Sequence, residues 1–114
     1  MRPHDPHSAY WAKWKFARLA LPLQERAREL GYALIAHGSI AFDIDMVAVP
    51  WTDDAVPAEE FVTEFVATVR QHDISPEEFH LLDGPTEKPH GRRAWSIHVQ
   101  GTYFDLSVLP RALP

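Results

Sequence analysis

The 114-residue chain contains no cysteine. This absence excludes a disulfide scaffold, a cysteine-ligated zinc or iron–sulfur site and a thiol nucleophile. No apolar run approaches the roughly 18 residues that a membrane-spanning helix needs. The N-terminal stretch 1–7 also lacks the apolar segment of a signal peptide. We therefore expect a cytoplasmic protein in a reducing compartment, with no membrane contact.

The chain also has no internal repeat and no low-complexity segment. Hydrophobic residues make up 46% and charged residues 24% of it, which is typical of an ordinary globular protein. Its length predicts a single domain over residues 1–114 and leaves no room for a separate substrate lid. A large substrate would therefore need a partner protein or a second copy to complete its site.

Charge is distributed unevenly around the net value of −5. Residues 1–32 carry six basic and three acidic side chains, whereas residues 43–83 carry eleven acidic side chains against Arg70 alone. A second group of basic residues follows at 88–93. This asymmetry is compatible with a polyanionic ligand held at one side of the molecule. The alternative is that the helices simply carry solvated charged faces.

Periodicity and turn residues predict eight helices and strands. Pro22 should break the first helix, because a proline inside a helix loses a hydrogen bond and clashes with the preceding turn. The expected elements are helices over 8–20 and 22–30, strands over 32–37 and 40–49, helices over 57–71 and 75–82, and strands over 94–99 and 102–109. They predict an α+β (α/β) fold: a small, mixed, largely antiparallel four-stranded sheet with helices on one face, in the order α-α-β-β-α-α-β-β. The segment 83–91, with two prolines and two glycines, is expected to be a loop.

The last two strands should form a hairpin around Gln100-Gly101, because a two-residue turn suits such a connection. If that turn sets the register, one face is apolar and the other polar, as directly opposed residues share a face. The predicted partners are Trp95 with Leu106, Ser96 with Asp105, Ile97 with Phe104, and His98 with Tyr103.

Two aspartates inside an apolar strand are the main chemical feature. Aspartate is depleted in strands, yet Asp43 and Asp45 interrupt the apolar run 40–49. Their spacing of two places both side chains on one face, about 7 Å apart along the strand. Asp105 lies in another apolar strand and would converge on them if the strands are neighbours. Such carboxylates suit one or two divalent cations, although a solvated face of a one-sided sheet would also carry them.

These residues resemble a known family. Gly38-Ser39, then Asp43-Ile44-Asp45, then Asp105 on a later strand is similar to the nucleotidyltransferase superfamily related to DNA polymerase β. The chain also resembles small uncharacterised proteins encoded by bacteriophages and prophages, in segments 88–95 and 104–111, which would place it in the host cytoplasm. The resemblance implies that Asp43, Asp45 and Asp105 are catalytic and hold Mg²⁺ (or Mn²⁺). It also implies that Gly38 and Ser39 bind the triphosphate of a nucleoside triphosphate.

The chemistry of such a reaction assigns further roles. Asp105 is positioned to accept the proton of an acceptor hydroxyl. Charge that develops on the phosphates needs cationic help, for which Lys88, Arg92 and Arg93 are candidates, with bidentate contacts from arginine. His98, on the predicted polar hairpin face, is a further candidate for nucleotide or phosphate binding.

The N-terminal segment combines aromatic and basic side chains. Tyr10, Trp14, Ala17 and Leu21 recur at helical spacing, with Trp11 beside them. Lys13, Lys15 and Arg18 lie between the aromatic residues. The segment predicts a surface for a protein partner or for self-association through Tyr10, Trp11 and Trp14, or core packing; nucleic acid binding is possible but not indicated.

Three functions follow from these patterns. The first is metal-dependent nucleotidyl transfer from a nucleoside triphosphate to an acceptor. The second is a non-catalytic, phage-type binding protein that keeps the fold. It is favoured by the connection between Ser39 and Asp43, which has only three residues and is shorter than in the family. The third is a metal-dependent nuclease or phosphohydrolase built on the same carboxylates.

Overall fold

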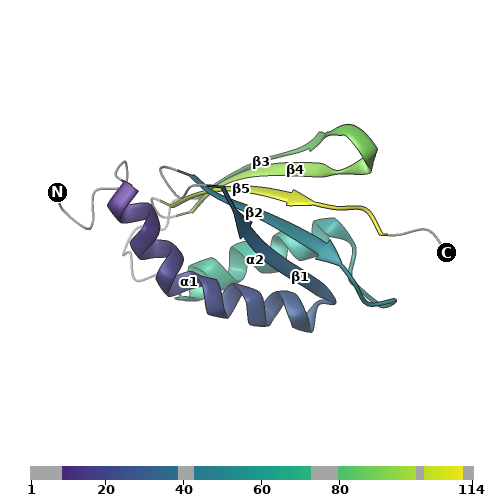
Figure 1. Cartoon of the computed structure of the whole chain (residues 1–114), viewed down its shortest axis with the longest axis horizontal. Helices are drawn as coiled ribbons and strands as arrows, with labels where there is room; N and C mark the ends of the chain where they lie inside the picture. The colour runs from purple at the N-terminus through teal and green to yellow at the C-terminus, as the bar shows by residue number, and fades with distance from the viewer. Residues whose placement is uncertain (1–8, 39–42, 73–79, 100–101, 112–114) are drawn as a thin grey trace.

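The computed structural model describes residues 9–38, 43–72, 80–99 and 102–111 (Figure 1). In this part of the chain, two helices and five strands follow one another, with a short 3-10 helix before the fourth strand. The elements are α1 (Ala9–Glu29), β1 (Tyr32–His37), β2 (Asp43–Pro50), α2 (Ala58–His72), β3 (His80–Glu87), η1 (Pro89–Gly91), β4 (Arg93–Val99) and β5 (Thr102–Val108).

The strands form one mixed sheet in the order β1-β2-β5-β4-β3. β2 and β5 run parallel, and the other neighbouring pairs are antiparallel. Both helices lie against the same face of the sheet, as Figure 1 shows, and no helix of the described residues covers the opposite face. The last strand in sequence therefore occupies the middle of the sheet, beside β2.

The predicted four-stranded, largely antiparallel sheet and the predicted element order are wrong. The additional strand is β3, where the sequence predicted the end of a helix and a loop; residues 75–79 of that helix lie outside the described residues. β3 pairs with β4 with a register shift between Asp83 and Thr86. Gly84 and Pro85 lie in this shift, at the sheet edge, where strands tolerate such residues.

The predicted helix break at Pro22 is also wrong, because α1 continues through this residue. The buried side chains before and after Pro22 lie on one stripe, spaced about four residues apart. They are Lys15, Leu19, Leu23, Ala27 and Leu30. Burial of this stripe offsets the roughly 3 kcal/mol that an interior proline costs a helix. The predicted stripe is displaced from it, since Ala17 and Leu21 are exposed.

The core lies between the two helices and the sheet. From α2 it receives Phe61, Val62, Phe65 and Val69, which recur at helical spacing. The Phe65 ring meets the Phe104 ring of β5 edge to face, with centroids 5.1 Å apart. From the sheet, alternate residues of β2, β4 and β5 fill the other side of the core.

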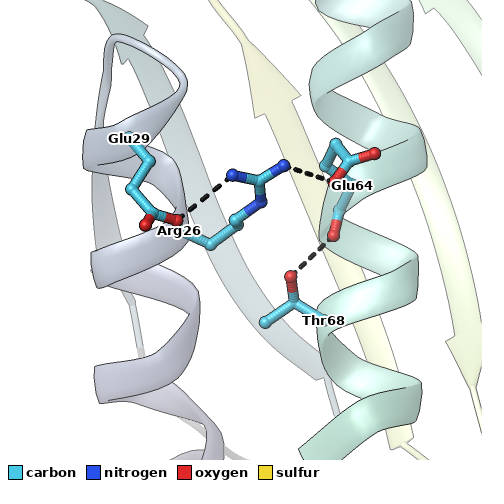
Figure 2. A network of polar contacts seen from close by, with 4 residues as sticks. All are labelled: Arg26, Glu29, Glu64 and Thr68. Atoms are coloured by element: carbon cyan, nitrogen blue, oxygen red, sulfur yellow. Dashed lines mark hydrogen bonds and ion pairs between the residues drawn. The ribbon is translucent and has the colours of Figure 1, made fainter.

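A polar contact joins the two helices at their surface (Figure 2). The Arg26 guanidinium on α1 donates to Glu64 Oε1 on α2 at 2.6 Å and to Glu29 Oε1 at 3.2 Å. Thr68 Oγ1 donates to the backbone oxygen of Glu64 at 2.7 Å. These groups align α1 with α2 outside the apolar core.

The turn between α1 and β1 requires Gly31. Its positive φ of +91° is a conformation that glycine commonly adopts just after the end of a helix. A Cβ atom here would lie 2.4 Å from Thr52 Oγ1 and 2.6 Å from Ala55 Cα. The backbone oxygen of Gly31 also accepts from Trp51 N at 3.0 Å. The segment after β2 therefore packs directly onto the end of α1.

The predicted β4–β5 register is confirmed. Each of the four predicted pairs, from Trp95 with Leu106 to His98 with Tyr103, is a register pair in the structure. Trp95, Ile97, Phe104, Leu106 and Val108 are buried on the side of the helices, as predicted. Gln100 and Gly101 themselves lie outside the described residues.

Candidate functional site

The three predicted aspartates lie on the face of the sheet that no described helix covers. In β2, Ile44, Met46 and Ala48 are buried toward the helices, so the alternating Asp43 and Asp45 face the other way. In β5, the same argument applies to Asp105, because the residues on either side of it are buried toward the helices. We call this surface the open face.

The register brings Asp45 and Asp105 together. β2 and β5 are neighbours, and Asp45 lies directly opposite Asp105. Neighbouring strands are about 4.8 Å apart, so the two carboxylates are within reach of a common ligand. Asp43 lies on the same face, opposite Tyr103. The sequence required the two strands to be neighbours for this convergence, and the structure places them so.

The pairing extends this arrangement across the sheet. His37 of β1 is opposite Asp45, Ser96 of β4 is opposite Asp105, and Asp83 of β3 is opposite Ser96. One polar side chain from each strand therefore forms a row, which we call the polar row. Its members are His37, Asp45, Asp105, Ser96 and Asp83.

The sequence interpretation missed two members of the polar row. Asp83 was assigned to a loop, and only its pairing with Ser96 shows its place. His37 received no site role from the sequence; it ends the predicted strand 32–37 and is the register partner of Asp45. The place of Asp83 depends on pairing with β4, which the local sequence pattern does not contain.

Like charges shape the electrostatics of this row. The pKa of Asp45 is raised, first by burial and then by the negative charges of Asp105 and Asp43, while His37 acts in the opposite direction. In the protein alone, the negative charge of Asp45 is not fully balanced by positive charge nearby. A bound cation would relieve the repulsion.

A shallow hollow of about 300 Å³ opens beside the carboxylates. It is lined by Asp43, Leu81, Asp83, Ser96, Ile97, His98, Tyr103, Phe104 and Asp105. The rings of His98 and Tyr103 are stacked in it, with centroids 4.0 Å apart and planes 22° from parallel. The predicted site residue His98 thus lies next to the carboxylates, on the register level of Asp43 and one level away from Asp45 and Asp105.

The donor set suits a hard cation, since Asp43, Asp45 and Asp105 offer only carboxylate oxygens. Within residues 9–38, 43–72, 80–99 and 102–111, however, no group of three or more His, Asp or Glu side chains is arranged to hold a metal ion. The side chains share a face and a register without enclosing a common point. Binding of Mg²⁺ or Mn²⁺ by these residues therefore stays a prediction, one that requires their side chains to turn toward a cation.

Gly38 lies beside Asp45. It has a φ of +70°, and a Cβ atom built on it would be 3.4 Å from Asp45 Oδ2. Its backbone is therefore next to the polar row, which is where the resemblance to nucleotidyltransferases led us to expect a phosphate-binding turn. Ser39, the second half of the predicted turn, lies outside the described residues, as does the rest of the connection to β2.

The structure does not bring Arg93 to the carboxylates. Arg93 points to the helix-covered side, where its two terminal nitrogens donate to Glu59 at 2.6 and 3.1 Å. This contact lowers the pKa of Glu59. In register Arg93 is opposite Val108, at the other end of β5 from Tyr103. Arg93 thus joins β4 to α2.

Arg92 and Lys88 have different positions. Arg92 Nη1 donates to Ser107 Oγ at 2.7 Å. Ser107 is on the open-face side of β5, two residues beyond Asp105, which corresponds to about 7 Å along the strand. Lys88 is exposed between β3 and η1. Of the three predicted phosphate-binding cations, Arg92 is the one that the contacts place on the open face.

The aromatic N-terminal segment belongs to α1. Trp14 is half-buried, and the Arg18 guanidinium lies over its ring at 5.4 Å from the centroid. The side chains of Tyr10 and Trp11 lie outside the described residues. The predicted partner surface at Tyr10, Trp11 and Trp14 therefore stays a prediction.

Comparison of the chain with family models, curated proteins and solved structures returns no match. Among the helices of the described residues, none is long and apolar enough to cross a membrane.

Proposed function

We propose that the open face binds a nucleoside triphosphate with Mg²⁺ or Mn²⁺ and transfers its nucleotidyl group to an acceptor hydroxyl. The observation that carries this proposal is the direct pairing of Asp45 with Asp105 on parallel neighbouring strands, with Asp43 on the same face. Paired carboxylates that contribute nothing to the packing of the core are typical of a site for divalent cations.

In this proposal, Asp43, Asp45 and Asp105 hold the cations, which would neutralise charge on the triphosphate. The acceptor oxygen attacks the α-phosphorus, and the bond from this phosphorus to the bridging oxygen of pyrophosphate breaks. Asp105 accepts the acceptor proton, since it lies at the exposed side of the pair. Gly38 provides backbone for close approach of the phosphates beside Asp45.

The test is thermal unfolding with Mn²⁺ and each nucleoside triphosphate, followed by a search for pyrophosphate release with hydroxyl acceptors. At 100 times its Kd, a ligand stabilises the folded state by about 2.7 kcal/mol, which raises Tm by several degrees in a domain of this size. The shift should disappear in Asp45→Asn and Asp105→Asn. Asp54→Asn, an exposed aspartate in the loop after β2, is the matched control and should keep the shift. No metal-dependent shift in the wild-type protein would refute the proposal.

A non-catalytic nucleotide-binding role is the second candidate. It is favoured by two contacts: Arg93 is held by Glu59 and Arg92 donates to Ser107, so two of the three predicted phosphate-binding cations already have partners. This role predicts metal-dependent nucleotide binding without pyrophosphate release for any acceptor. A nuclease or phosphohydrolase would instead cleave its substrate with metal and without added triphosphate.

A further inference from the structure

Two stacked rings stand next to the polar row on the open face. The register level adjacent to Asp45, Asp105, Ser96 and Asp83 consists of Asp43, Tyr103, His98 and Leu81 in strand order. Tyr103 and His98 occupy its centre, where their rings are stacked with centroids 4.0 Å apart. The two rings are only half-buried, so their position is not explained by the core.

The hollow of about 300 Å³ joins these rings to the carboxylates. Its lining includes His98 and Tyr103, the apolar residue Leu81, and the three aspartates Asp43, Asp83 and Asp105. Leu81 is 57% exposed at the rim of the hollow. The hollow therefore combines an aromatic pair with carboxylates on two sides, Asp43 beside Tyr103 and Asp105 two residues along β5.

We propose that the His98–Tyr103 pair is a stacking subsite for the nucleobase of the bound nucleotide. This inference rests on the proposed function and names the part of the substrate that the hollow recognises. Planar bases stack on aromatic side chains, and the half-buried His98–Tyr103 pair lines the same hollow as the carboxylates. From the ring level to Asp105 the strand advances by two residues, about 7 Å, which leaves space for the sugar between base and phosphates.

A phosphate contact from His98 is the competing role for the same residue. The two roles predict different ligand dependence. A stacking subsite distinguishes a nucleoside triphosphate from inorganic tripolyphosphate, whereas a phosphate contact contributes to the binding of both. Tyr103 sharpens the distinction, because its ring is expected to contribute through stacking.

The experiment is calorimetric titration of the full chain with Mn²⁺ and either a non-hydrolysable nucleoside triphosphate analogue or inorganic tripolyphosphate. The wild-type protein should bind the analogue more tightly. Tyr103→Leu and His98→Leu should weaken binding of the analogue about tenfold, the scale expected for loss of one stacked base. Both variants should leave tripolyphosphate binding unchanged, and Tyr103→Phe, which keeps the ring, should retain wild-type affinity for the analogue.

Equal affinity of the wild-type protein for the analogue and for tripolyphosphate would overturn the stacking subsite but leave the proposed function intact. A loss of tripolyphosphate binding in His98→Leu would do the same, and would assign His98 to the phosphates. Failure of the wild-type protein to bind either ligand would overturn both proposals. If the leucine variants fail to fold, as judged by circular dichroism, the wild-type comparison of the two ligands decides the question.

Discussion

The two faces of β2 and β5 differ sharply although they belong to the same strands. Toward the helices, Ile44, Met46 and Leu106 are fully buried at 0% exposure. On the open face, Asp43 and Asp105 are exposed, and Asp45 lies between them with a raised pKa. The covered face is what burial of apolar surface demands of any sheet. The open face places like charges in register, which folding does not demand, so function is the better explanation for it.

The largest predicted effect is the difference in free energy of unfolding between substitutions on the two faces of β5. Leu106→Ala removes fully buried volume and should lower the free energy of unfolding by about 2–5 kcal/mol. Asp105→Ala removes an exposed carboxylate that faces Asp45 and should cause no comparable loss. Urea unfolding of both variants checks the prediction. A similar loss in Asp105→Ala would mean that the open face stabilises the fold and would weaken its assignment to binding.

Two glycines at the ends of β1 extend the comparison. Gly31→Ala places a Cβ atom against Thr52 and Ala55 at positive φ and should cost about 2–4 kcal/mol. Among the described residues, the Cβ atom of Gly38→Ala meets Asp45 Oδ2, at 3.4 Å, and the change should cost about 1–2 kcal/mol from its backbone conformation. Thermal unfolding measures both variants. Equal losses would show that the turn beside the carboxylates is packed as tightly as the one beside the helix.

Substitutions of the neighbouring arginines Arg92 and Arg93 should also differ, one in binding and the other in stability. Arg93→Gln loses its partly exposed contact with Glu59 and should lower Tm slightly, with no change in triphosphate binding. Arg92→Gln removes the cation beside Ser107 on the open face and should weaken binding of Mn²⁺ with tripolyphosphate. Titration of the two variants in parallel decides between them, and a loss of binding in Arg93→Gln alone would reverse the assignment.

The smallest effect concerns the pH dependence of Asp45. Its pKa is raised in the folded state, so the folded protein binds this proton more readily than the unfolded chain does. The charged form therefore destabilises the fold at neutral pH, and this loss is relieved as the pH falls through the folded pKa. Asp45→Asn should give a small increase in Tm at pH 7 in the absence of metal, which shrinks toward acidic pH. A lower Tm at pH 7 would mean that the Asp45 carboxylate is structurally required.

Local patterns in the sequence were sufficient for part of the fold. The β4–β5 register was predicted because a two-residue turn and strict alternation both determine it, and they agree. The helix over 57–71 was predicted, and α2 spans Ala58–His72, because Phe61, Phe65 and Val69 recur at helical spacing. In each case the information lies within about fifteen residues of the chain.

The remainder depends on pairing between distant residues. β3 was missed because Gly84-Pro85 signals a loop, and only its contact with β4 holds this segment as an edge strand. The continuity of α1 was missed because burial of residues on both sides of Pro22 overrides the local penalty of proline. For the site, the sequence singled out Asp43, Asp45 and Asp105 by their unusual positions in strands. It did not show that Arg93 points away from these aspartates.

Binding of Mn²⁺ by the open face tests the account most directly. Electron paramagnetic resonance reports free Mn²⁺ during titration of the protein with Mn²⁺. Wild type and Asp54→Asn should remove Mn²⁺ from solution, and Asp45→Asn and Asp105→Asn should each lose at least about tenfold in affinity, since each removes a charged ligand. Equal binding by all four proteins, or no binding by the wild-type protein, would contradict the assignment of the Asp45–Asp105 pair to a metal–triphosphate site.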